Sequence, residues 1–242
     1  QQAHRCQPEG NPMVYQARWI DRFLPSTCLL CGAAASIGLD ACADCIADLP
    51  ENGPACTACA MPLPEPGLCG ACLRSPPRVS ASYCAFRYTY PVRELLLRFK
   101  GGGDLATGRM LTELMARQLA ARTCSEGKDW TLVPVPLARE RLGVRGFNQA
   151  ERIARVLGKR LGMQVASHLA SRVRTTPDQK GLSAAERRRN LDGAFAVRPC
   201  AGKRLLLVDD VMTTGATANA LAGAFLAAGA GELRLWCLAR AV

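Results

Sequence analysis

The chain has 242 residues, of which 49% are apolar, so it can bury one sizeable core and still form a smaller module. No uncharged apolar stretch reaches the roughly 18 residues that a membrane-spanning helix needs, and the N-terminal residues show no secretory signal pattern. We therefore expect two unequal domains, no membrane insertion and a cytoplasmic location. Residues 1–22 are expected to be a partly disordered N-terminal extension.

The formal net charge is +11, and the positive charge lies in one part of the chain. Residues 1–90 carry six Lys or Arg against seven Asp or Glu, whereas residues 91–242 carry twenty-five against thirteen. Such an excess attracts polyanions, either a nucleic acid or a small diphosphate, and does not distinguish between them.

Eight of the thirteen cysteines form four C-x-x-C pairs within residues 23–75. A C-x-x-C turn directs two thiolates at one point, so two turns complete a tetrahedral zinc site. We predict two structural zinc ions, whose binding replaces the core that so small a module cannot build. The even spacing fits consecutive ribbons and a cross-braced pairing alike, although we favour consecutive ribbons. Disulfides, the alternative, are typical of secreted domains. The expected ligands are Cys28, Cys31, Cys42, Cys45, Cys56, Cys59, Cys69 and Cys72.

Residues 76–82 contain Pro76 and Pro77 and are interpreted as a linker. After the linker, patterns of strands and helices alternate. Strands are expected at 83–88, 130–136, 204–208 and 232–238, and helices at 92–99, 105–121, 147–161 and 217–228. This alternation predicts an α/β domain over residues 83–242, with a doubly wound, mostly parallel sheet.

The segment that indicates chemistry is Val208-Asp209-Asp210-Val211-Met212-Thr213-Thr214-Gly215-Ala216-Thr217. A buried strand delivers two carboxylates to the carboxyl edge of the sheet, where ligands of open α/β sheets bind. The backbone amides of residues 213–217 and the following helix N-terminus can surround a phosphate monoester. Asp209 and Asp210 can accept hydrogen bonds from two vicinal hydroxyls. The segment therefore predicts a site for a ribose 5-phosphate.

This segment matches the phosphoribosyl-diphosphate (PRPP) signature of phosphoribosyltransferases. Two further segments are Val133-Pro134-Val135-Pro136-Leu137 and Arg145-Gly146-Phe147-Asn148-Gln149-Ala150-Glu151. Together with the C-x-x-C pairs, they resemble the ComF/GntX family of phosphoribosyltransferase-like proteins, which is linked in bacteria to competence for DNA uptake. The resemblance extends from about residue 23 to residue 238, and it implies a type I phosphoribosyltransferase fold behind a double zinc ribbon.

The resemblance also implies PRPP as the ligand and phosphoribosyl transfer, with release of diphosphate, to an unidentified acceptor. Asp209 and Asp210 would hold the ribose, and the PRPP-binding segment would continue through Val211, Met212, Thr213, Thr214, Gly215, Ala216 and Thr217. Val135, Pro136, Arg139 and Arg145 would face the diphosphate through Mg²⁺. Gln179 and Arg187 would lie in a loop that closes over the site, with Arg187, Asp209 and Asp210 as the catalytic residues.

Two other functions are compatible with the sequence. In the first, the chain binds single-stranded DNA and PRPP is a regulatory ligand. Residues 139–204 hold sixteen Lys or Arg and five Asp or Glu, although aromatic residues for base stacking are nearly absent. In the second, the zinc ribbons are an adaptor for a partner such as a DNA-uptake motor protein. The resemblance also implies that the chain forms a homodimer.

Overall fold

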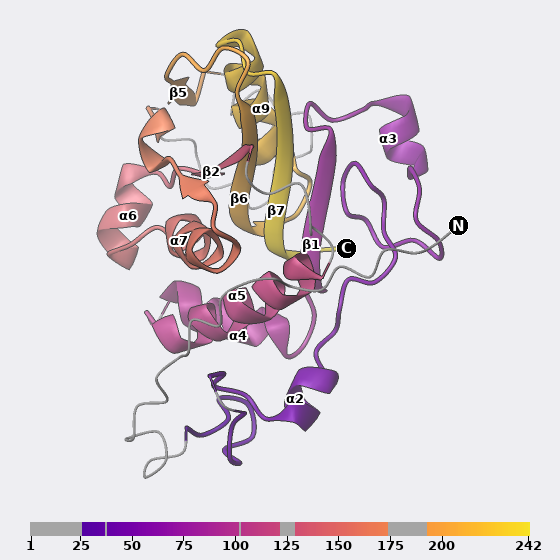
Figure 1. Ribbon diagram of the computed structural model, residues 1–242, viewed down its shortest axis with the longest axis vertical. Coiled ribbons are helices and arrows are strands. Elements are labelled where there is room, and N and C mark those ends of the chain that lie inside the picture. The colour runs from indigo at the N-terminus through magenta and orange to yellow at the C-terminus, as the bar shows by residue number, and fades with distance from the viewer. Residues whose placement is uncertain (1–25, 37, 102, 122–128, 174–192) are drawn as a thin grey trace.

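The computed structural model describes residues 26–36, 38–101, 103–121, 129–173 and 193–242, and its central feature is a five-stranded sheet (Figure 1). The strand order is β1-β7-β6-β2-β3, and all neighbours pair in parallel. A separate antiparallel pair is formed by β4 and β5. The strands are β1 (Ala81–Arg87), β2 (Trp130–Pro134), β3 (Gln164–Val165), β4 (Ala170–Arg172), β5 (Phe195–Val197), β6 (Arg204–Met212) and β7 (Glu232–Arg240).

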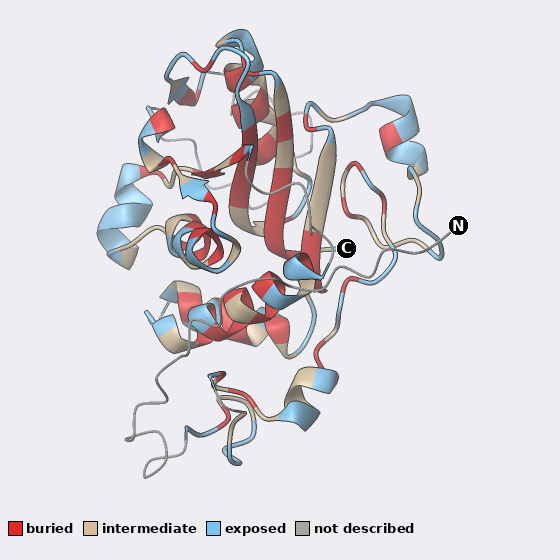
Figure 2. Cartoon of the chain, viewed as in Figure 1, coloured by how far each residue is buried: buried red, intermediate tan, exposed pale blue. Residues whose placement is uncertain are grey.

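Helices cover both faces of the sheet, which confirms the predicted doubly wound α/β class. The alternation of side chains along β6 separates two cores, because successive residues of a strand face opposite sides. Leu206 and Val208 join one core, and Leu205 and Leu207 join the other. Figure 2 shows buried residues concentrated along β6 and β7 (Glu232–Arg240). The first core packs under α4 (Val92–Gly101), α5 (Leu105–Ala120) and α7 (Gln149–Leu161), and the second under α9 (Ala216–Ala227).

Side-chain caps fix where two of these helices begin. The Asn148 side chain accepts a hydrogen bond of 3.0 Å from the Ala150 N–H, so α7 starts at Gln149 rather than at residue 147 as predicted. The Asp104 carboxylate accepts from the Thr107 N–H at 3.1 Å and starts α5 in the same way. Helix α7 ends at Leu161, and the left-handed backbone of the next residue, Gly162, is typical of a helix C-terminus.

The first zinc ribbon, residues 26–49 with the short helix α2 (Ala43–Ala47), packs against α4 and α5. Its Cys28 and Leu39 are buried in the same core as these helices. At the surface, Asp40 Oδ2 lies 2.6 Å from Arg109 Nη2. The Leu29 carbonyl also accepts a hydrogen bond of 3.3 Å from Arg98. This ribbon is therefore attached to the helices of one face.

The second zinc ribbon, residues 50–75 with the short helix α3 (Gly70–Arg74), lies along the outer edge of β1. The Asn52 N–H donates to the Ala85 carbonyl at 3.0 Å, and the Ser82 N–H donates to the Thr57 carbonyl at 2.8 Å. The Ser82 hydroxyl also donates to the Ala58 carbonyl at 2.7 Å. Backbone groups on the free side of β1 are thus paired with this ribbon.

Several elements differ from the sequence prediction. Strand β6 does not end at Val208 but continues to Met212, because β7 continues beside it as far as Arg240. Helix α6 (Arg139–Arg145), the short 3-10 helix η1 (Ser167–Leu169) and the β4-β5 pair were not predicted. The expected extension at 1–22 lies outside the described residues. Within the described ranges, no helix is long and apolar enough to cross a membrane.

Candidate metal centres and phosphoribosyl site

Each zinc ribbon gathers four cysteine sulfurs that lie within 4.8 Å of one another. The Sγ atoms of Cys31 and Cys42 are 3.7 Å apart, and so are those of Cys59 and Cys69. Zinc–sulfur bonds of about 2.3 Å in a tetrahedron separate the sulfurs by about 3.8 Å, so each set fits one zinc ion. The ribbons are consecutive rather than cross-braced. The first set is Cys28, Cys31, Cys42 and Cys45, and the second is Cys56, Cys59, Cys69 and Cys72.

Backbone amides prepare one thiol of each set for metal binding. Burial opposes ionisation of Cys28, but N–H groups, that of Cys42 foremost, outweigh it and lower the pKa of this thiol to about 6. The same balance lowers the pKa of Cys56 to about 6, and the Cys69 N–H donates to its sulfur at 3.3 Å. Because the thiolate is the form that binds zinc, both sets suit structural Zn²⁺. The described cysteines form no disulfide.

The second candidate site lies at the carboxyl edge of the sheet, where β6 leads into α9. Asp209 and Asp210 occupy the last part of β6, and both are partly buried. Asp210 Oδ2 lies 3.1 Å from Nζ of Lys100, near the end of α4. Asp209 instead lines a small cleft together with residues 211–218 and Cys237. The two neighbouring carboxylates therefore have different surroundings.

The environment of Asp209 resists its ionisation. Burial and the charge of Asp210 raise the pKa of Asp209 to about 7. The Asp210 N–H, which donates to Asp209 Oδ1 at 2.9 Å, and the positive charges of Lys100 and Arg172 offset part of this effect. A carboxyl group with so high a pKa in a cleft is typical of a functional site.

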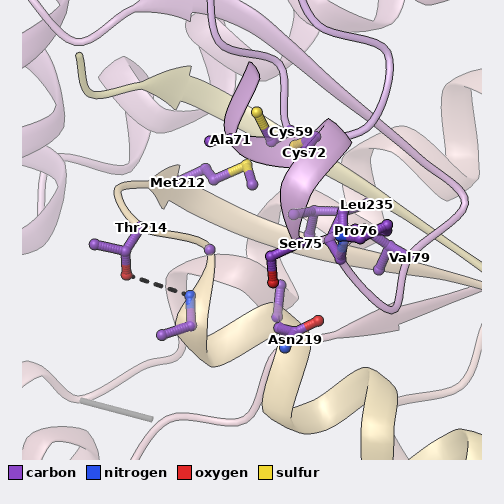
Figure 3. A pocket seen from close by; sticks show the side chains of 14 residues that line it. Cys59, Ala71, Cys72, Ser75, Pro76, Val79, Met212, Thr214, Asn219 and Leu235 are labelled. Atoms are coloured by element: carbon purple, nitrogen blue, oxygen red, sulfur yellow. Dashed lines mark hydrogen bonds between the residues drawn. The ribbon is translucent and has the colours of Figure 1, made fainter. Parts of the chain in front are cut away.

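The phosphate loop, residues 213–217, joins β6 to α9. Gly215 has a φ of 72°, a left-handed conformation that glycine adopts without strain, and it directly precedes α9. The Ala216 N–H donates to the Thr214 hydroxyl oxygen at 3.3 Å (Figure 3). The first amides of a helix have no intrahelical acceptor, so the start of α9 offers N–H groups to an anion.

The residues predicted to face a diphosphate lie after β2, the neighbour of β6. The Val135 N–H donates to the Val208 carbonyl at 2.9 Å, which keeps this segment beside the acidic strand end. Pro136 and Arg139 line a cavity of about 230 Å³ together with Arg172. Arg145 is at the far end of α6, where it donates to Gln149 at 3.2 Å, and it does not line this cavity. Arg187 and Gln179 lie outside the described residues.

Known proteins resemble the chain over most of its length. A family model described as "Double zinc ribbon domain" matches residues 19–73. The "DNA utilization protein YhgH" of Salmonella typhi is 33% identical over 222 residues, 90% of this chain and 98% of that protein. "Competence protein F" of Haemophilus influenzae is 35% identical over 72% of this chain and 78% of that protein. The chain belongs to the competence protein F family.

This finding confirms the family resemblance drawn from the motifs. "Competence protein ComFC" of Streptococcus pneumoniae is a more distant relative, 26% identical over 64% of the chain and 66% of that protein. Among solved structures, the UMP synthase of Leishmania donovani aligns with 59% of this chain and 22% of that chain. Its TM-score of 0.31 and identity of 17% are too low to bear on function.

In this member of the competence protein F family, three residues near the site were not predicted from the sequence. Lys100, in the last turn of α4, forms an ion pair with Asp210. Arg172 acts on the pKa of Asp209 from the short strand β4, which had no recognisable pattern. Arg240 ends β7 and is buried against the phosphate loop. Its one sequence signal is a charge at the end of an apolar strand.

Proposed function

We propose that this protein binds PRPP with Mg²⁺ at the carboxyl edge of its sheet and transfers the phosphoribosyl group to an acceptor. The main support is that one strand–turn–helix unit holds Asp209, Asp210 and the phosphate loop in immediate succession. A phosphate-binding turn beside carboxylates is poorly suited to a plain polyanion, because the carboxylates would repel it. It suits a ligand that carries both a phosphate and hydroxyl groups, as a ribose 5-phosphate does.

Each side of the ligand has a proposed partner. The 5-phosphate accepts hydrogen bonds from the amides and hydroxyls of residues 213–217, and the carboxylates accept from the ribose hydroxyls. The diphosphate extends toward the cavity that holds Arg139 and Arg172. Mg²⁺ takes oxygen ligands, of which the carboxylates offer several, and it would neutralise charge on the diphosphate.

The proposed reaction is a substitution at C1 of the ribose. The bond from C1 to the diphosphate oxygen breaks, and its electron pair leaves with the diphosphate. A nucleophilic atom of the acceptor forms the new bond to C1 and releases its proton to solvent. The protein contributes by orientation and by positive charge from Arg139 and Arg172 near the leaving group, which is electrostatic stabilisation prepared before the reaction. Arg187 stays a predicted catalytic residue.

Calorimetric titration of PRPP and Mg²⁺ into the zinc-loaded protein tests this proposal. We expect micromolar affinity in the wild type and its loss in the double variant Asp209→Asn, Asp210→Asn. Glu232→Gln is a matched control, because Glu232 pairs with Arg204 at the opposite end of the sheet. Absence of binding by folded wild-type protein would refute the PRPP site. Equal affinity in the double variant would refute the proposed role of the carboxylates.

A second candidate function is single-stranded DNA binding or an adaptor role in competence, with PRPP as a regulatory ligand. It is favoured by the names of the relatives, which refer to DNA utilization and competence, and by the net charge of +11. The proposed partners are single-stranded DNA, a DNA-uptake motor protein and a second copy of the chain, and the proposed location is cytoplasmic. DNA affinity that falls steeply with salt, unchanged by Asp209→Asn, would favour this function over catalysis.

A further inference from the structure

Arg240 connects the second zinc ribbon to the phosphate loop. It is the last residue of β7, and only 5% of it is exposed. Its Nε donates to the Cys59 carbonyl at 3.0 Å, and its Nη1 donates to the carbonyls of Met212 at 3.2 Å and Thr213 at 2.5 Å. Nη1 also donates to the Ala241 carbonyl. One guanidinium therefore binds carbonyls from three separate parts of the chain.

Two of the segments that Arg240 joins belong to the two candidate sites. Cys59 is a ligand of the second zinc set, Met212 directly precedes the phosphate loop, and Thr213 is the first residue of the loop. A guanidinium is a rigid planar fork of donors, so it can fix the relative positions of carbonyls that it bridges. Buried charge also requires such hydrogen bonds, which makes their loss costly. A shift of the backbone at one site would therefore move the backbone at the other.

The carbonyls that Arg240 holds also orient amides of the phosphate loop. In a trans peptide the C=O and the following N–H point in opposite directions. Holding the carbonyls of Met212 and Thr213 on Arg240 therefore directs the N–H groups of Thr213 and Thr214 away from it. These are amides that the phosphate loop offers to an anion. Arg240 is in this way a positioning residue that need not touch the ligand.

A second contact supports the link between the second ribbon and the loop. A cavity of about 240 Å³ lies between them, lined by Cys59 and Cys72 on one side and by Met212, Thr214 and Gly215 on the other (Figure 3). Beside this cavity, the backbone N–H of Arg78 donates to Asn219 Oδ1 of α9 at 2.7 Å. The segment that follows the second ribbon is therefore hydrogen-bonded to α9, the helix that follows the phosphate loop.

The first ribbon has a different position. Its contacts with Arg98 and Arg109 attach it to α4 and α5. None of the residues that the structure describes in this ribbon lines the cavity beside the phosphate loop. The two zinc sets therefore provide an internal comparison within one molecule.

We propose that Arg240 couples the second zinc site to the phosphate loop, so that zinc at this site and a phosphoribosyl ligand at the loop strengthen each other's binding. The identity of the ligand rests on the function proposed above, whereas the mechanical link does not. Coupling between two sites is reciprocal. The ligand must therefore raise the affinity for zinc by the same factor by which zinc raises the affinity for the ligand. Zinc at the first site lacks this link.

The rate of zinc release tests for this coupling without reference to catalysis. A chromogenic chelator is added to the full-length protein with and without saturating PRPP and Mg²⁺, and the two zinc ions are followed in time. We expect PRPP to slow the release of one ion at least fivefold in the wild type and in Cys42→Ser, which keeps only the second site. Cys69→Ser, which keeps only the first site, is expected to show no such effect.

The decisive variant is Arg240→Lys, which retains the charge but carries all its donors on one nitrogen. It therefore cannot reproduce the separate contacts of Nε with Cys59 and of Nη1 with Met212 and Thr213. We expect it to bind two zinc ions and to lose the effect of PRPP on zinc release. Arg234→Lys is the matched control, because Arg234 lies on the same strand near its other end and pairs with Glu232. Slowed release that persists in Arg240→Lys, or that occurs in Cys69→Ser, would overturn the proposal.

Hydrogen exchange separates failure of this proposal from failure of the proposed function. The exchange rates of the backbone amides in residues 212–217 are measured in the ligand-free wild type and in each ligand-free variant. We expect exchange at least tenfold faster in Arg240→Lys and in Cys69→Ser than in the wild type, with little change in Arg234→Lys. If PRPP does not bind the wild type, the proposed function fails while this test still applies. Unchanged exchange in Arg240→Lys would refute the link itself.

Discussion

Replacement of Asp209 by Asn should stabilise the unliganded protein, and more so at high pH. The pKa of Asp209 rises from 3.8 to about 7 on folding, chiefly through burial and the charge of Asp210. Because this pKa is raised, the group contributes stability at low pH, and that contribution is lost as the pH rises from about 4 through 7. Above pH 7 the full cost of ionising the folded group is about 4 kcal/mol.

Asparagine removes the charge and keeps an oxygen that can accept from the Asp210 N–H. We therefore expect the free energy of unfolding of Asp209→Asn to exceed that of the wild type by about 1–2 kcal/mol at pH 5 and by up to about 4 kcal/mol at pH 8.5. Urea unfolding with excess zinc at both pH values measures this difference. Loss of zinc at low pH affects both chains and largely cancels in the comparison.

Asp210→Asn is a control that should change the free energy of unfolding in the opposite direction. Asp210 pairs with Lys100, whose side chain is 21% exposed, so this substitution leaves a largely buried ammonium group without its carboxylate. We expect it to lower the free energy of unfolding by about 1–2 kcal/mol at pH 5. The loss should be smaller at pH 8.5, because removing the Asp210 charge also makes Asp209 easier to ionise. An equal effect of Asp209→Asn at pH 5 and pH 8.5 would show that the Asp209 carboxyl has an ordinary pKa, and would refute the reasoning.

Three further predictions follow from the geometry. Because ionised Asp209 is the better acceptor for ribose hydroxyls and its pKa is about 7, PRPP affinity measured by calorimetry should rise about tenfold from pH 6 to pH 8, and Asp209→Asn should abolish this dependence. Gly215→Ala should cost about 1 kcal/mol in urea unfolding, because φ is 72° and the new Cβ would lie 2.8 Å from Met212 Cε. Gly108→Ala should cost about 1–3 kcal/mol, because its Cβ would lie 2.4 Å from the Phe99 ring, whereas Gly143→Ala meets open space and should not destabilise.

The sequence was a good guide to the elements whose patterns are local. Helix α5 was expected over 105–121 and spans Leu105–Ala120, because its apolar positions repeat at helical spacing and Asp104 marks its start. The extent of β6 was not local information. Residues 209–212 are extended because β7 lies beside them, and that pairing joins residues nearly thirty positions apart. Helix α6 was missed because it is short and has no buried residue.

The candidate site shows the same difference between features set by local sequence and features set by long-range contacts. The C-x-x-C turns and the strand–turn–helix segment are contiguous, so their ligands could be named from spacing alone. The sequence did not decide how the cysteine turns pair, because equal spacing permits two arrangements. Arg240 could not be found, since its partner Cys59 lies 181 positions away and a lone arginine at a strand end is usually a solvated charge. Lys100 and Arg172 likewise reach the site only through the packing of α4 and β4.

The position of the second ribbon along β1 has a consequence for biosynthesis. β1 begins at Ala81, but its partner in the sheet, β7, begins only at Glu232 and is synthesised much later. At about 5–20 residues per second, β1 waits roughly 8–30 s on the ribosome for that partner. An unpaired strand is a template for aggregation between chains. The second ribbon precedes β1 in the chain, and once folded around zinc it can shield one side of the strand during this interval. Zinc supply during translation should therefore govern how much of the protein escapes aggregation.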